Sequence, residues 1–409
     1  MKKVRIALHW QILIAIVLGV SFGIFFHHYV PYVEWFGRLF LRALGMIVIP
    51  LIFSSLVMGM SNMGRSLDLG RIAGRSLLFF LVTTAIAACL GLFFVNIIKP
   101  GVGTDLSLTQ EVTGLAATNI SFVNQLLAVV PSNVFEDMAK GNLLPVVFFA
   151  IVFGFFITRT GDKTKQVMGD LFDSIFDVIM RITLYIIKFT PFGVFAIVSN
   201  VIAKQAGDTG ALLDVLNGVG LYAATVCGGC LVHGLIVLPA LVYFLSGKSG
   251  FKLIKKMSTP LLAGFSTCSS SAVLPLSLRD IQEKVGVSNK VASFVHPVGT
   301  AINMNGTALF ECVSALFIAQ AYGIELSIVQ QLMVVATAIM VAIGAAGIPM
   351  AGLVMMTIVL SAVGLPLEGI GLVLAVQQPC DMVRTTINVF GDACTSVIVA
   401  TAEGEKLNL

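Results

Sequence analysis

Cys380-Asp-Met-Val-Arg-Thr-Thr-Ile-Asn-Val-Phe-Gly-Asp392 is the stretch that decides the fold. Its polar members share one face of a helix, at spacings of one, three or four residues: Asp381, Arg384, Thr385, Asn388 and Asp392. The sequence before it is apolar, with no charge between Leu326 and Leu367. Charged groups at membrane depth are costly unless they are paired, wetted or bound to a ligand. A structural Asp381–Arg384 pair is the alternative, but such a pair leaves Asn388 and Asp392 unexplained.

The composition is that of a polytopic membrane protein. Hydrophobic residues make up 57% and charged residues 11%, whereas a soluble chain carries about 25% charged residues. The net charge of +4 is too small and scattered to suggest nucleic acid as a partner. The 7 cysteines lie in apolar surroundings, including the Cys227–Cys230 pair, which indicates packing rather than disulfides or redox chemistry.

The apolar runs predict membrane spans, since a hydrocarbon core needs roughly 20 residues per helix. The first six spans are expected at Ile6–Tyr29, Arg42–Gly64, Ser76–Ile98, within Ser121–Ile157, at Leu171–Ala203 and at Leu216–Leu245. Basic clusters precede the first span, follow the second and follow the sixth. By the positive-inside rule these clusters lie in the cytoplasm. We expect a multi-pass protein of the cell (inner) membrane with both termini cytoplasmic.

Two later apolar segments, Met257–Leu278 and Leu326–Leu367, are interrupted at their centres. Residues 266–271 of the first read Ser-Thr-Cys-Ser-Ser-Ser, and residues 344–349 of the second read Gly-Ala-Ala-Gly-Ile-Pro. Small or helix-breaking residues at that depth indicate helical hairpins, because irregular backbone is tolerated only where it is buried in protein or lines a cavity. Such a pair of segments points to a transporter binding site. For the serine run, simple helix packing by small residues remains the alternative.

Between the hairpins, Val298–Glu311 contains Asn303-Met-Asn-Gly306. A helix break there frees backbone oxygens, which are the hard ligands that a sodium ion needs. Glu311 is an isolated carboxyl group in an apolar segment and therefore a candidate proton carrier. A neutral glutamic acid hydrogen-bonded within the core is the alternative.

The order of these motifs resembles the dicarboxylate/amino acid:cation symporter family, which includes bacterial glutamate transporters and animal excitatory amino acid transporters. The motifs are the serine-rich hairpin, Asn-Met-x-Gly-Thr, the glycine-rich hairpin and Asp-x-x-Arg-Thr-x-x-Asn-x-x-Gly-Asp. The resemblance covers essentially the whole chain. It implies an all-α fold of eight transmembrane helices plus two re-entrant hairpins in inverted repeats. It also implies a homotrimer in the lipid bilayer that works as an elevator, is not an enzyme and holds no covalent cofactor.

The family's domain pattern implies a scaffold and a moving transport domain. The scaffold would comprise residues 1–70 and 119–212, and the transport domain residues 71–118 and 213–409. The hairpins would span about 253–283 and about 326–365.

The resemblance also assigns substrate contacts, residue by residue. Arg384 would bind a side-chain carboxylate and Asp381 the α-amino group. The α-carboxylate would lie at Asn388 and near Ser269 and Ser270. Thr307 and Thr385 would complete the pocket, and the gate would be formed by Gly347, Ile348 and Gly352.

Sodium sites follow in the same way. The first would use Asp392, Asn388 and backbone oxygens of Gly299 and Asn303. The second would use carbonyls of Ala301, Ala342, Ile343 and Ala345. A third would use Thr83, Thr84, Asn303 and Asn305.

Several positions depart from the family pattern. Asn305 stands where the family has an aspartate and Phe80 where it has a tyrosine, which weakens the third sodium site. Glu311 matches the proton carrier of the animal transporters. An accessory arginine is missing, because Cys268 and Met382 occupy its two usual places. We therefore expect fewer sodium ions, with H⁺ as a further coupling ion.

Arg384 predicts an acidic amino acid, L-glutamate or L-aspartate, as the substrate. A C4-dicarboxylate is the alternative, although Asp381 would repel its second carboxylate. An anion channel is a further alternative, as is an intramembrane serine protease built on Ser269–Ser271 and His296, although the chain has no Gly-x-Ser-x-Gly elbow.

Overall fold

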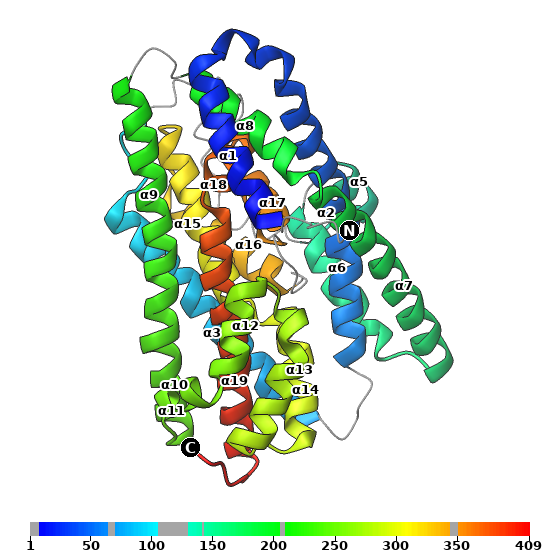
Figure 1. Cartoon of the computed structure of the whole chain (residues 1–409). Coiled ribbons are helices and arrows are strands. Elements are labelled where there is room, and N and C mark those ends of the chain that lie inside the picture. The colour runs from blue at the N-terminus through cyan, green and yellow to red at the C-terminus, as the bar shows by residue number, and fades with distance from the viewer. Residues whose placement is uncertain (1–7, 64–69, 105–129, 141–142, 205–208, 344–350) are drawn as a thin grey trace, which may run out of the picture.

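The computed structural model describes residues 8–63, 70–104, 130–140, 143–204, 209–343 and 351–409. Throughout these ranges the regular structure is helical and includes no strand, which confirms the all-α prediction. Two sets of helices pack mainly within themselves (Figure 1). The first set consists of α1 (Leu8–Phe25), α2 (Glu34–Met63), α5 (Val134–Lys140), α6 (Leu143–Ile157), α7 (Asp162–Ile187) and α8 (Thr190–Lys204).

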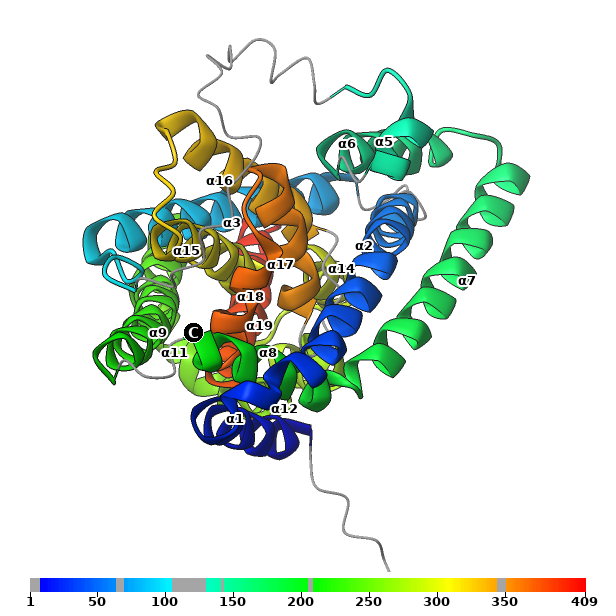
Figure 2. The same ribbon diagram turned by 90° about the horizontal axis from the view of Figure 1, so that it is seen from above.

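The second set surrounds the C-terminal helix. Its members are α3 (Gly70–Ile98), α9 (Thr209–Val232), α10 (Leu238–Ser246), α11 (Gly250–Lys256), α12 (Ser258–Thr267), α13 (Ser270–Asp280), α14 (Asn289–Ile302), α15 (Asn305–Ala321), α16 (Ile328–Ile343), α17 (Ala351–Ala362), α18 (Ile370–Leu374) and α19 (Gln377–Ala402). Helix α19 contacts α3, α9, α10, α12, α14 and α15. Seen from above, the first set lies along one side of the second (Figure 2).

The expected span at Leu171–Ala203 is two helices in the structure rather than one. Helices α7 and α8 meet at a bend of 53°. Pro191 lies in the first turn of α8, where its missing N–H costs little, but the same residue cannot extend the hydrogen-bond ladder of α7. The predicted span Leu216–Leu245 lies within one continuous helix, Leu213–Ser246, which contains a π-helical turn at His233–Val237 between α9 and α10.

Both predicted hairpins have paired arms. Helices α12 and α13 pack on each other, and the turn between them places Cys268 in the left-handed region with φ +53°. The Ser269 hydroxyl then accepts a hydrogen bond from Ala272 N–H at 3.2 Å, which caps α13. Helices α16 and α17 also pack together, but their connection lies outside the described residues. The two hairpins approach α19 from opposite ends of the molecule (Figure 1).

Three helices in the described ranges are long and apolar enough to cross a membrane: Arg71–Ile98, Leu213–Ser246 and Asn289–Ala321. The bent α7–α8 pair would be a fourth. The count of eight spans stays a prediction.

Candidate functional site

The polar stripe of α19 is buried as a unit. Asp381, Arg384, Thr385, Asn388 and Asp392 are each at most 4% exposed. Groups withdrawn from water to this extent need hydrogen-bond or ionic partners within the protein. The partners are supplied by α15 and the segment before it, and by α19 itself.

Arg384 and Asp381 form a buried ion pair one helical turn apart. Arg384 Nε and Nη2 donate to Asp381 Oδ1 at 3.0 and 2.7 Å, and Thr385 Oγ1 donates to the same oxygen at 3.3 Å. The guanidinium carbon lies 4.8 Å from the centre of the Phe310 ring, which is cation–π distance. Arg384 Nη1 has no hydrogen-bond partner among the described residues. One donor of the guanidinium is therefore left over for another acceptor.

The second hairpin lies directly over this free donor. A Cβ atom placed on Gly352 of α17 would collide with Arg384 Nη1. Gly352, a predicted gate residue, is therefore in contact with the guanidinium, and the lack of a side chain there permits it. Gly347 and Ile348 lie outside the described residues.

The predicted helix break is found at Asn303 and Met304. Helix α14 ends at Ile302 and α15 begins at Asn305, with backbone angles of φ −88°, ψ 76° and φ −107°, ψ 57° in between. Asn388 of α19 holds this break in place. Its Oδ1 accepts from Gly306 N–H at 2.8 Å, and its Nδ2 donates to Thr307 Oγ1 and to Met304 Sδ, both at 3.2 Å.

Most of the first predicted sodium set comes together at the end of α14. Asn303 Nδ2 donates to Asp392 Oδ1 at 2.9 Å. A Cβ atom on Gly299 would collide with the same Asp392 oxygen, so the carboxylate lies against the α14 backbone. Asn388, four residues before Asp392, turns instead toward the helix break.

The residues of the third predicted sodium site also meet. Asn305 Oδ1 accepts hydrogen bonds from Thr84 Oγ1 at 2.8 Å and from Thr83 Oγ1 at 3.3 Å. The Asn305 Nδ2 atom is buried without a partner in the part of the chain that the structure describes. A carboxylate would offer a second acceptor oxygen and a negative charge here, whereas the amide offers a donor. Phe80 is buried beside Gly299 and adds no oxygen.

Glu311 lies deep in α15, with only 1% of its surface exposed. Neither of its carboxyl oxygens has a partner among the described residues, and Arg384 is a cation within its electrostatic reach. Such burial is tolerated best by the neutral acid. The position fits a group that gains and loses a proton.

The remaining predicted residues are only partly placed. Ser269 and Ser270 lie buried at the tip of the first hairpin, which Gln378 fastens to α19 through a 3.3 Å contact from its Nε2 to Cys268 Sγ. For the second sodium set, α14 with Ala301 contacts α16 with Ala342 and Ile343, but Ala345 lies outside the described residues.

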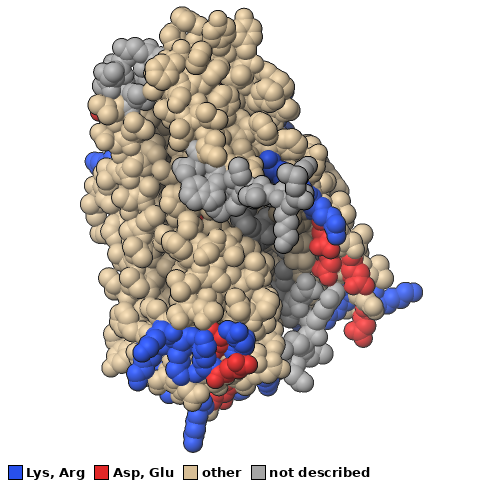
Figure 3. Space-filling model, viewed as in Figure 1, with Lys and Arg blue, Asp and Glu red and all other residues tan. Residues whose placement is uncertain are grey.

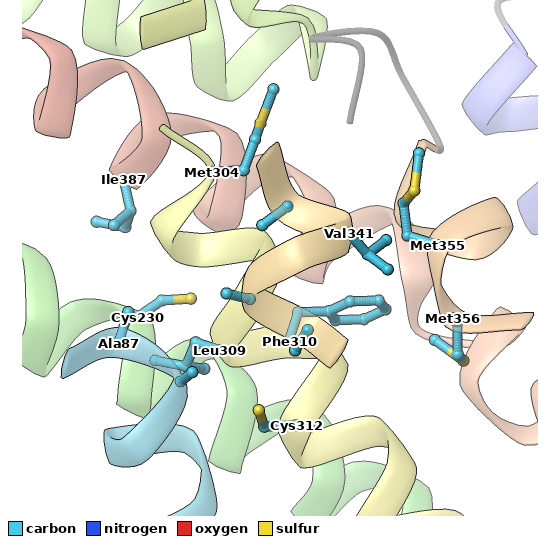
Figure 4. Packing of buried hydrophobic residues seen from close by; sticks show 14 of the residues in the cluster. Ala87, Cys230, Met304, Leu309, Phe310, Cys312, Val341, Met355, Met356 and Ile387 are labelled. Carbon is cyan, nitrogen blue, oxygen red and sulfur yellow. The ribbon is translucent and has the colours of Figure 1, made fainter. Parts of the chain in front are cut away.

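Met304, Gly306 and Phe310 hold the site together, but the sequence did not identify them as part of it. Phe310 lies three residues after Thr307, so it shares the same helix face, and this spacing was the available signal. Figure 4 shows the Phe310 ring beside Val341, on the side of the cluster where Met355 lies.

The predicted sodium sites contain buried oxygen atoms of two kinds. The hydroxyls of Thr83 and Thr84 and the amide of Asn305 lie in one predicted site, and the carboxylate of Asp392 lies in another. No cluster of three or more histidine, cysteine, aspartate or glutamate side chains occurs in the described ranges.

Comparison with known proteins identifies the family. Residues 8–402 match the model of the sodium:dicarboxylate symporter family, and the chain belongs to that family. Its relatives include the proton/sodium-glutamate symport protein of Geobacillus stearothermophilus, 33% identical over 98% of this chain and 96% of the relative. Excitatory amino acid transporter 3 of Mus musculus is 33% identical over 98% of this chain and 86% of the relative. The C4-dicarboxylate transport protein of Bacillus subtilis is 32% identical over 97% of this chain and 93% of the relative. The predicted family and its transporter class are confirmed.

Proposed function

We propose that this protein takes up an acidic amino acid, L-glutamate or L-aspartate, together with Na⁺ and with a proton carried by Glu311. The observation that carries the proposal is the Arg384–Asp381 pair, whose Nη1 donor has no partner among the residues that the structure describes. A symport protein for glutamate and an excitatory amino acid transporter are among the relatives.

The pair matches the two charges of the substrate. Arg384 presents a planar fork that binds a carboxylate in bidentate fashion. Asp381 offers an acceptor to an ammonium group. A ligand with both groups can replace the internal ion pair by two ion pairs of its own, so neither buried charge is left alone. A neutral amino acid would leave Arg384 without such a partner.

Asn388 supplies a physical link between substrate and ion. It contacts Thr307 of the proposed pocket and Gly306 of the helix break, and Asp392 lies four residues further along the same helix. A sodium ion at Asp392 and Asn303 would fix the break, and the break would in turn fix Thr307 for the substrate. Each ligand therefore favours the arrangement that the other needs, which is reciprocal coupling.

The proposed movement is an elevator within a homotrimer. Helices α3 and α9–α19 would carry the site, while α1, α2 and α5–α8 would stay fixed. Support comes from the packing: α1 contacts α8, and α2 contacts α6, α7 and α8, whereas α15 packs along α3 and α19 packs within the other set.

A C4-dicarboxylate is the second candidate, because the Bacillus subtilis relative is named as a transporter of such substrates. Asp381 disfavours it. A second carboxylate placed near Asp381 would meet a like charge in a buried site.

Competition tests the substrate class. Uptake of labelled L-glutamate into proteoliposomes is measured with excess L-aspartate, succinate, fumarate or L-alanine. We expect L-aspartate to compete and the others to have little effect. If succinate and fumarate competed and L-aspartate did not, a C4-dicarboxylate would become the first candidate substrate and an acidic amino acid the second.

A further inference from the structure

A groove of about 600 Å³ lies outside the proposed site, between α10, α11 and the end of the chain. Its walls are largely apolar and include Leu235, Ile236, Tyr243, Phe244, Phe251 and Lys252. Nothing in the transport chemistry described above uses it.

The groove follows from a sharp corner in the chain. Helix α10 ends at Ser246, and Gly247 after it has a left-handed φ of +66°. Ser249 then caps α11 by accepting from Lys252 N–H at 3.4 Å. Gly250 packs so closely on Pro239 that a Cβ atom there would overlap it. The two helices are therefore fixed at an angle to each other, and the groove between them has firm walls.

The aromatic residues of the groove face outward. Phe244 is 80% exposed, Phe251 65% and Tyr243 62%. A contiguous apolar surface of this kind marks contact with a membrane or a partner. Because the chain belongs to a membrane transporter family, hydrocarbon is the natural environment of these side chains. Tyrosine is typical of the level where hydrocarbon gives way to headgroups.

One lysine, Lys252, lines the groove, and Lys248 adjoins it between the lining residues Gly247 and Ser249. Lys248, Lys252 and Lys255 form no ion pair within the described ranges. Three acids of this end are engaged elsewhere: Asp280 with Arg279 and Lys284, Glu403 with Arg71 and Arg75, and Glu405 with Ser288. Glu283, in the helical turn Ile281–Val285 that contacts α11, is an exposed acid of the same end. Basic side chains gather at this end of the molecule, with acidic side chains beside them (Figure 3).

We propose that the groove binds an anionic phospholipid. An acyl chain lies along Ile236 and Phe244, and the headgroup phosphate lies between Lys248 and Lys252. Free lysines next to an apolar groove are complementary to a lipid with net negative charge, whereas the cationic group of a zwitterionic lipid would repel them. Helices α10 and α11 form the groove and belong to the set proposed to move during transport, so the bound lipid would move with them.

Fluorescence quenching tests the proposal in the full chain. The tryptophans at positions 10 and 35 are replaced by phenylalanine, and Phe244→Trp introduces one reporter into the groove. The protein is reconstituted in mixtures of phosphatidylglycerol and phosphatidylcholine, with brominated chains on one lipid at a time. Phe251→Trp serves as a second groove reporter. Phe93→Trp is the matched control, since Phe93 of α3 is 58% exposed but lies outside the groove.

At the groove positions we expect brominated phosphatidylglycerol to quench with a relative association constant up to about 30-fold above that of phosphatidylcholine, the preference that two surface lysines together supply. Lys248→Gln with Lys252→Gln should reduce the ratio to about one, while Lys163→Gln with Lys188→Gln should leave it unchanged. The proposal would be overturned if both lipids quenched equally or if the preference for phosphatidylglycerol survived loss of the groove lysines. The same preference at position 93 would also overturn it. Absence of quenching by either lipid would overturn it as well.

Discussion

Arg384 Nη2 lies 2.7 Å from Asp381 Oδ1, and the two side chains are only 3% and 1% exposed. Breaking a buried pair by removing one partner leaves an uncompensated charge, which costs about 3–5 kcal/mol. A ligand that brings both a carboxylate and an ammonium group avoids this cost. The charges of the pair alone therefore favour an acidic amino acid, whatever the shape of the pocket.

Arg384→Gln should abolish uptake of acidic amino acids. The substituted amide cannot neutralise the substrate carboxylate, and truncation of a buried charged partner costs about 2–5 kcal/mol, or roughly 30-fold or more in kcat/KM. Initial rates of labelled L-glutamate uptake measure this. Arg279→Gln is the control, because that arginine is 46% exposed in its side chain and pairs with Asp280. Unchanged kcat/KM in Arg384→Gln would refute the assignment.

Gly352→Ala should weaken substrate binding without unfolding the protein. The added methyl group would displace the Arg384 guanidinium, since even a Cβ atom collides with Nη1. We expect KM for L-glutamate to rise about tenfold, the effect of roughly 1.4 kcal/mol. Gly228→Ala is the matched control, because a Cβ atom there has no neighbour within 4 Å. If both variants had the wild-type KM, α17 would not act as a gate over Arg384.

Glu311→Gln should remove the proton from the transport cycle. The glutamine keeps the shape of the side chain but cannot ionise. In the wild type, an inward proton gradient added to a sodium gradient should increase uptake, and in the variant it should not. Glu325→Gln is the control at an exposed carboxylate. Equal stimulation in Glu311→Gln and wild type would assign the proton to another group.

Asn305→Asp should strengthen sodium dependence. A carboxylate would accept hydrogen bonds from Thr83 and Thr84. It would also add a charged oxygen ligand where the amide nitrogen has no partner in the described part of the chain. We expect a steeper dependence of uptake on sodium concentration, with a higher Hill coefficient. Adding Thr84→Val should reverse the gain. An unaltered sodium curve in Asn305→Asp would mean that no ion enters this position.

Glu403 should make a small contribution to stability that depends on pH. Arg71 Nε donates to Glu403 Oε1 at 2.9 Å, and hydrogen bonding with Arg71 lowers the pKa of this carboxyl group below its usual 4.5. A depressed pKa adds stability above pH 4.5, and this stability is lost as the pH falls through the folded-state value. Glu403→Gln should therefore lower the unfolding midpoint by about 1 °C at pH 7, because exposed pairs are weak, and by less at pH 4. An equal decrease of the unfolding midpoint at pH 7 and pH 4 would contradict a stabilising ion pair between Glu403 and Arg71.

Much of the site could be predicted from the sequence because its chemistry is local. The polar stripe on α19 follows from helical spacing. The break at Asn303 and Met304 lies in a polar motif inside an apolar run, and polar residues there indicate a functional role. The first hairpin follows from six small residues in the middle of a span-length segment.

Other features depend on contacts between distant segments. The pairing of Asn388 with Met304, the ring of Phe310 under Arg384 and the closeness of Gly352 to Nη1 join residues from different helices. No periodicity encodes such contacts. The bend between α7 and α8 differs from the predicted single span because apolar residues lie on both sides of it, and only Lys188, Thr190 and Pro191 mark the change of direction.

The most direct measurement is uptake of labelled L-glutamate and L-aspartate into proteoliposomes under a sodium gradient, a proton gradient, and both. The account predicts uptake driven by sodium alone, which a proton gradient increases further. No uptake of either amino acid under any gradient would contradict it.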